Sequence, residues 1–247
     1  MTDKANHVTD SELSSRTSNR VGFYSAIFTA IITVVTFGFA ITAIPISGAN
    51  CVEGCIEYPY LNTIAQFPKD YLWMYLAAIL VLSYMVLMVS IHAYAAQPKK
   101  IFSQIGLSFA IIASTILLMD FFVQFSVVPV SLMNGETEWI TLLTQYNAHG
   151  LFIVMEELGY LMMALSFLFV APVFAQRSRL ESAVRWVFVL SFVLAMVALV
   201  IISINHGLDR KDRFEVAIIS IDWLVLIING ILLSIVFKKQ LKEKRIG

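Results

Sequence analysis

Four acidic residues interrupt segments of the chain that are otherwise apolar enough to cross a bilayer. They are Asp120, Glu156, Glu157 and Asp222. Because a charge in hydrocarbon is costly, such residues usually face the interior of a helix bundle or a wet cavity, where they mark a functional site. Carboxyl groups in such a place can hold a cation or exchange a proton. The sequence therefore predicts a polar binding site within a membrane protein.

Other polar residues share helix faces with these acids, because side chains four or seven positions apart lie on one side of a helix. Gln124 follows Asp120 by four residues, and Asn229 follows Asp222 by seven. Glu215 precedes Asp222 by seven and lies on the same line. The predicted ligand-binding residues are Asp120, Gln124, His149, Glu156, Glu157, Tyr160, Asp222 and Asn229.

Direction and depth both suggest that the acids converge. His149, Glu156 and Tyr160 fall on one helical line, whereas Glu157 points about 100° away at 3.6 residues per turn. Asp120 and Glu156 each lie about 28 Å from the inner ends of their segments at 1.5 Å rise per residue, and Asp222 lies about 22 Å from the inner end of its segment. In a hydrocarbon core about 30 Å thick, all three are predicted to lie in the outer leaflet, near one level. We expect a polar cavity that opens outward.

A metal centre is a second interpretation of the same residues. Zinc and iron accept imidazole nitrogen and carboxylate oxygen ligands. The candidate ligands are His149, His206 and Glu156. The chain has no HExxH motif and no clustered triad of ligands. A metal centre therefore stays a candidate, but the spacing of these residues does not support it.

The fold that must position these residues is an all-α, polytopic membrane bundle of six transmembrane helices. Hydrophobic residues make up 59% of the chain and charged residues only 14%, and a membrane span needs about 20 apolar residues. We place the polar cavity between spans three, four, five and six. The predicted spans are Gly22–Ile46, Asp70–Ala95, Ile101–Leu132, Leu151–Ala175, Arg185–Asn205 and Val216–Phe237.

The segment 134–150, between spans three and four, has the pattern of a short amphipathic helix. Its apolar residues recur at i, i+3, i+4 and i+7, and Asn134 could cap its start. Tryptophan and tyrosine suit the headgroup level of a bilayer. We therefore predict an interfacial helix here, acting as an anchor or a lid. The apolar residues are Trp139, Leu142, Leu143 and Tyr146.

Most of the 17 lysines and arginines fall on the side that carries both termini. The positive-inside rule then places both termini in the cytoplasm of a cell-membrane protein. Residues 1–20 are predicted to be a disordered tail, 21–237 the transmembrane domain and 238–247 a basic tail. The basic tail could bind anionic lipid headgroups. No nucleic-acid partner is expected.

The two cysteines, Cys51 and Cys55, lie in the first outer loop. A local disulfide is one expectation if that side is oxidising, and two free thiols are the other. A closed zinc site needs four ligands, so this pair alone is not expected to bind metal.

These observations leave three classes of function open. The first is binding, with or without transport, of a small cation, proton or polar solute at the outer carboxyl groups. The second is a membrane enzyme that uses a metal or a carboxyl pair on a lipid-like substrate. The third is a non-catalytic sensor or assembly factor. A G-x-S-x-G nucleophile motif, a phosphate-binding loop and a dinucleotide fingerprint are all absent from the sequence.

Overall fold

The chain folds into helices and loops in the computed structural model, which describes residues 2–42, 46–174 and 178–243. No strand occurs within these ranges. Short 3-10 helices cover Leu61–Gln66, Lys69–Tyr71, Gln97–Lys99, Ala171–Val173 and Gly207–Asp209. Two short α-helices are α4 (Val128–Asn134) and α5 (Ile140–Leu143). The long helices are α1 (Thr2–Thr42), α2 (Leu72–Tyr94), α3 (Lys100–Ser126), α6 (Leu151–Val170), α7 (Arg179–His206) and α8 (Arg213–Glu243).

Six helical segments of the described chain are long and apolar enough to cross a membrane. They coincide with the six stretches predicted from the sequence, so the all-α architecture and the number of apolar helices are confirmed. Each is helical because a long apolar run satisfies its own backbone hydrogen bonds only as a helix. The six helices are compatible with a multi-pass membrane protein.

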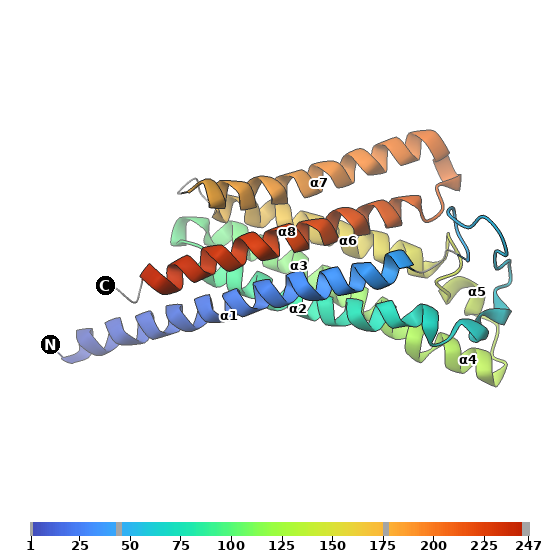
Figure 1. Ribbon diagram of the computed structural model, residues 1–247, viewed down its shortest axis with the longest axis horizontal. Coiled ribbons are helices and arrows are strands. Elements are labelled where there is room, and N and C mark those ends of the chain that lie inside the picture. Colours follow the sequence, from blue (N-terminus) through green and yellow to red (C-terminus); the bar gives the residue numbers. More distant parts are fainter. Residues whose placement is uncertain (1, 43–45, 175–177, 244–247) are drawn as a thin grey trace.

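The long helices form a ring in which each contacts its neighbours in the sequence. α1 packs against α2, α2 against α3, α3 against α6, α6 against α7, α7 against α8, and α8 returns to α1. α6 also contacts α8 across the ring. Both termini lie at one end of the bundle, which we call the tail end, and α4 and α5 lie at the opposite end, which we call the loop end (Figure 1).

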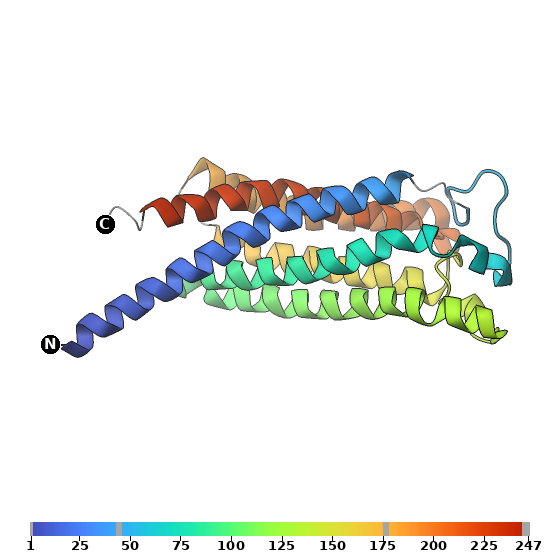
Figure 2. The same cartoon turned by 60° about the horizontal axis from the view of Figure 1, so that its bottom comes forward.

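Helix α1 extends well before the first apolar stretch. It begins at Thr2, within the segment 1–20 that was predicted to be a disordered tail, and its first part extends past the other helices (Figure 2). Residues 2–20 contain neither glycine nor proline, so nothing in the sequence stops the apolar part of the helix from continuing outward. Helix α8 likewise runs into the basic tail as far as Glu243. The division at residues 20 and 237 stays a prediction.

The third span is interrupted near the loop end. α3 ends at Ser126 and α4 begins at Val128, with Pro129 in its first turn. A proline removes one backbone donor and is tolerated in the first turn of a helix. The predicted span Ile101–Leu132 is therefore two consecutive helices.

The predicted amphipathic helix in 134–150 is reduced to the single turn α5, and its place at a membrane interface stays a prediction. Asn134 ends α4 instead of capping a new helix. The Gln124 side chain fixes the segment: its amide donates to the Leu143 carbonyl at 2.5 Å and accepts from the Gln145 amide at 3.0 Å. Tyr146 is buried, and burial raises the pKa of its hydroxyl. These polar contacts draw the segment into the bundle and end the helix.

The loops at the loop end are tied to one another. Cys51 and Cys55 form a disulfide, one of the two outcomes that the sequence allowed. The Asp212 carboxylate, just before α8, accepts a hydrogen bond of 2.7 Å from the Ala49 amide. Gly48 has a φ of +76°, and any Cβ there would meet that carboxylate. The described part of the loop between α1 and α2 is thus fixed to the turn between α7 and α8.

Candidate functional site

Three buried carboxyl groups from three helices come together near the loop end. They belong to Asp120 of α3, Glu156 of α6 and Glu215 of α8, and we call them the acidic cluster. Their exposed fractions are 2%, 0% and 8%. Glu156 lies within electrostatic range of both other carboxyl groups and faces Glu215 most closely. Each residue lies within about 9 Å of the loop end of its helix at 1.5 Å per residue, so the three carboxyl groups lie near one level of the bundle.

Among the described residues, no N–H or hydroxyl group donates to either oxygen of Glu156 or to Oδ2 of Asp120. The Glu156 carboxyl group instead lies within hydrogen-bonding reach of the Glu215 carboxyl group. Leaving a buried acceptor unsatisfied costs about 1–3 kcal/mol, and more for a charged group. Such atoms in a native fold call for a proton, an ion or another ligand.

Glu157 lies next to Glu156 in the sequence but has a different partner. Its carboxylate forms an ion pair of 2.5 Å with Arg210, in the turn between α7 and α8. The exposed fractions of the two side chains are 10% and 32%. Because its charge is compensated, Glu157 forms the edge of the site next to the acidic cluster and contributes little free negative charge.

A line of polar side chains leads from the acidic cluster into the bundle. The Tyr160 hydroxyl lies near Glu156 and accepts a hydrogen bond of 3.1 Å from the Trp223 indole. Asp222 lies seven residues beyond Glu215 on α8 and accepts a hydrogen bond of 2.9 Å from Ser191 of α7. Oδ2 of Asp222 is a further buried oxygen with no partner among the described residues.

A further pair of buried polar side chains lies between α2 and α6. The hydroxyl groups of Tyr84 and Ser166 are hydrogen-bonded to each other, joining α2 to α6. Tyr84 also lies within electrostatic range of Asp222. Buried hydroxyl and carboxyl groups therefore extend from the acidic cluster toward the middle of the bundle.

Three predicted site residues have other surroundings. Gln124 binds backbone groups of the segment before α6, as described above. The Asn229 amide donates to the Val184 carbonyl at 3.3 Å and lies about 21 Å along α8 from Glu215 at 1.5 Å per residue. His149 is exposed. Of the predicted set, the structure gathers Asp120, Glu156, Glu157, Tyr160 and Asp222 around one region.

The three predicted metal candidates do not meet. His149 and His206 are both exposed, whereas Glu156 is fully buried. Within the part of the chain that the structure describes, no three His, Cys, Asp or Glu side chains are arranged to hold a metal ion. His149 precedes the first turn of α6 and His206 ends α7, so both occupy helix ends at the surface.

Glu215 was not among the predicted site residues, although it completes the acidic cluster. It lies two residues after the start of α8, between charged residues and the apolar run. From the sequence alone, it therefore looks like one of the polar residues that flank a span. Its spacing of seven from Asp222 was the signal that could have identified it. Its burial on the inner face of α8 distinguishes Glu215 from a polar residue at the border of a span. That burial depends on how the helices are ordered around the ring.

A groove of about 450 Å³ leads to Glu215 from the side of the bundle. It lies among α1, α2 and α8, and we call it the aromatic groove because three of its residues are Phe37, Trp73 and Trp223. The remaining lining residues are Ala40, Ile41, Asn50, Val216, Ile219 and Ser220. Glu215 is the one acidic residue in this lining.

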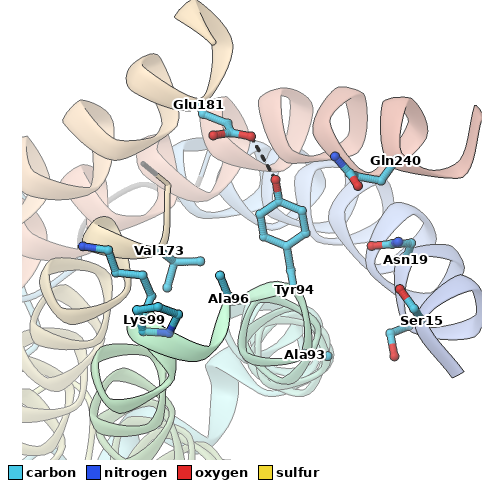
Figure 3. Close-up of a pocket in the computed structure, with 11 residues that line it drawn as sticks. Ser15, Asn19, Ala93, Tyr94, Ala96, Lys99, Val173, Glu181 and Gln240 are labelled. Atoms are coloured by element: carbon cyan, nitrogen blue, oxygen red, sulfur yellow. Dashed lines mark hydrogen bonds between the residues drawn. The ribbon is translucent and has the colours of Figure 1, made fainter. Parts of the chain in front are cut away.

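A separate pocket of about 280 Å³ occupies the tail end. The Tyr94 hydroxyl donates to Glu181 at 2.9 Å, and Ser15, Asn19 and Gln240 line the other side of the pocket (Figure 3). Because it lies at the opposite end of the bundle from the acidic cluster, it is a different site.

Comparison with known protein families, with curated proteins and with solved structures finds no match for this chain.

Proposed function

We propose that this chain is a multi-pass membrane protein that binds a cation at the acidic cluster in exchange for a proton. The observation that carries the proposal is the convergence of Asp120, Glu156 and Glu215: the Glu156 and Glu215 carboxyl groups face each other, and no N–H or hydroxyl group of the described residues donates to Glu156. Two like charges about 4 Å apart repel by about 4 kcal/mol at an effective dielectric constant of about 20. Three buried carboxylates therefore need a proton or a cation between them.

The exchange follows from the chemistry of the carboxyl groups. A proton on one of them relieves the repulsion, and a bound cation does the same. The two ligands compete, so lowering the pH weakens cation binding and adding the cation releases protons. The polar line through Tyr160 and Asp222 supports a path along which a proton could move toward the middle of the bundle. We propose that the loop end faces outward and the termini face the cytoplasm, as the lysine and arginine distribution favours.

Proton release tests this proposal. Purified protein in weakly buffered dodecyl maltoside is mixed with NaCl, KCl, CaCl₂ or methylammonium chloride at constant ionic strength, and a pH-indicator dye reports released protons. We expect at least one of these salts to release protons from the wild type, and Glu156→Gln to lose most of that release. Glu138→Gln, which removes an exposed carboxyl group, serves as the matched control. No release by any of these salts or by a larger organic ammonium salt, or equal release by Glu156→Gln, would overturn the proposal.

We also propose an anionic lipid site at the tail end. A groove of about 620 Å³ between α1 and α8 is lined by Arg16, Arg20, Lys238 and Lys242, and no acidic residue is among its described lining residues. All four cations are exposed. Basic pockets between spanning helices suit anionic headgroups, and each cation near a charged surface contributes about 1 kcal/mol. The groove joins the predicted basic tail to the first helix.

Thermal unfolding in mixed micelles tests the lipid site. We expect phosphatidylglycerol to raise the unfolding temperature of the wild type more than phosphatidylcholine does. The variant with glutamine at positions 16, 20, 238 and 242 should lose this difference, because it lacks the charges that hold the headgroup. Glutamine at Lys99 and Lys211 provides a control for general loss of charge. An undiminished lipid effect in the quadruple variant would rule the groove out as the site.

A further inference from the structure

We infer that the cation bound at the acidic cluster is an organic ammonium ion with an apolar arm, which reaches Glu215 through the aromatic groove. This inference rests on the proposed function and names the chemical class of its ligand. Two independent observations carry it: the buried Glu156 carboxyl group, which faces Glu215 and receives no hydrogen bond from an N–H or hydroxyl group of the described residues, and the groove of about 450 Å³ that Glu215 lines.

The walls of the aromatic groove suit an ammonium ion. Phe37 of α1 and Trp223 of α8 lie edge to face, with ring centroids 5.6 Å apart. Trp73 of α2 completes the wall and packs edge to face against Phe121, whose neighbour in the sequence is Asp120. An aromatic face attracts a cation within about 6 Å, most strongly when both are desolvated. Three such rings beside one carboxylate are the recognition elements of organic ammonium groups.

The groove also discriminates between kinds of cation. A small inorganic ion keeps its hydration shell, which apolar and aromatic walls do not replace. An ammonium group with carbon substituents is weakly hydrated and gains from contact with those walls. The apolar rim around Ile41, Val216 and Ile219 can hold a hydrocarbon or aromatic arm while the positive head faces Glu215.

The source of the ammonium ion is a free amine or quaternary ammonium compound, and not a lipid headgroup. A choline lipid carries its phosphate next to the ammonium group, which would place a negative charge beside Glu215 and Glu156. Like charges held close together in a buried site repel. A free organic cation carries no phosphate, so these carboxyl groups do not repel it.

Benzyltrimethylammonium chloride is the probe that we would use. It is titrated into the protein in dodecyl maltoside, and both proton release and tryptophan fluorescence are recorded. Its neutral isostere, neopentylbenzene, carries carbon in place of the charged nitrogen. We expect saturable proton release and a fluorescence change with the cation, and neither with the isostere or with added phosphatidylcholine. An equal effect of the isostere, or an equal effect of phosphatidylcholine, would overturn the inference.

Three variants test the location. Phe37→Leu removes one ring but keeps apolar volume, and should weaken binding about five-fold. Phe109→Leu, the same change at a ring that stacks on Phe169 away from the groove, should leave binding unchanged. Ser220→Phe should fill the groove and block benzyltrimethylammonium without touching a carboxyl group. Unaltered affinity in both Phe37→Leu and Ser220→Phe would contradict the inference.

The two proposals fail in different ways. If one of the small salts releases protons from the wild type but benzyltrimethylammonium does not, the ligand class is wrong and the proposed exchange stands. If no cation of any kind releases protons, both proposals are overturned. If benzyltrimethylammonium releases protons and Ser220→Phe abolishes that release, both are supported.

Discussion

Glu156 and Glu157 are adjacent in the sequence, yet their surroundings are opposite. Successive residues of a helix point about 100° apart, so one carboxyl group enters the acidic cluster and the other reaches Arg210. The first has no donor among the described residues, while the second has a charged one. The carboxyl group of the acidic cluster and the carboxyl group of the ion pair therefore belong to consecutive residues of α6.

The ion pair predicts a measurable stability effect. Replacing Arg210 with glutamine leaves the partly buried Glu157 carboxylate without its charged partner. We expect a loss of about 1–3 kcal/mol in the free energy of unfolding, because an unsatisfied group of this kind costs that much. Unfolding in a detergent mixture of increasing denaturing strength measures it.

The double variant Arg210→Gln, Glu157→Gln is the control for this prediction. Removing both charges should restore most of the lost stability, since no charge is then left alone. A double variant as unstable as Arg210→Gln would show that Arg210 acts through some other contact.

At the scale of elements, the apolar runs were sufficient to predict six helices, because membrane spans must be long and internally hydrogen-bonded. The breaks were harder to predict. The interruption at Val127 depends on Pro129 near the end of a long apolar run, and apolarity alone does not show where the helix divides. The segment 134–150 has helical spacing, but Gln124, a residue of another helix, determines its path. A local proline decided the first region, and contacts with another helix decided the second.

A close contact of α3 with α6 gives a prediction at this scale. A Cβ built on Gly106 would lie 2.6 Å from the Val170 side chain and 3.0 Å from the Ser166 carbonyl oxygen. Gly106→Ala should therefore destabilise the fold by about 1–3 kcal/mol through overpacking. This would occur although alanine favours a helix by about 1 kcal/mol over glycine. Thermal unfolding compares the variants.

Gly38→Ala is the matched control, because a Cβ on Gly38 of α1 meets nothing within 4 Å. That variant should gain up to about 1 kcal/mol from helix propensity alone. If Gly106→Ala were as stable as Gly38→Ala, the helices would not be in close contact at this position.

For the whole molecule, the order of helices around the ring determines which residues form the site. The sequence predicted that Asp120, Glu156 and Asp222 share a depth, since depth follows from counting residues along each helix. It did not predict that α3, α6 and α8 bring Glu215 beside Glu156 while Asp222 lies deeper against Ser191. Neighbour relations between helices are not encoded in the periodicity of any one of them. The site was therefore predicted in part, and its third acid only from the structure.

The disulfide between Cys51 and Cys55 uses both cysteines of the chain. The unreduced protein consequently offers no thiol to alkylating reagents, and a cysteine introduced by mutation becomes the single position that a maleimide dye can label. One such residue in place of Glu136 at the loop end, and another in place of Lys239 at the tail end, would report on intact cells which end a membrane-impermeant dye reaches. The native bridge thus makes the sidedness of the molecule measurable without removing any natural residue of the acidic cluster.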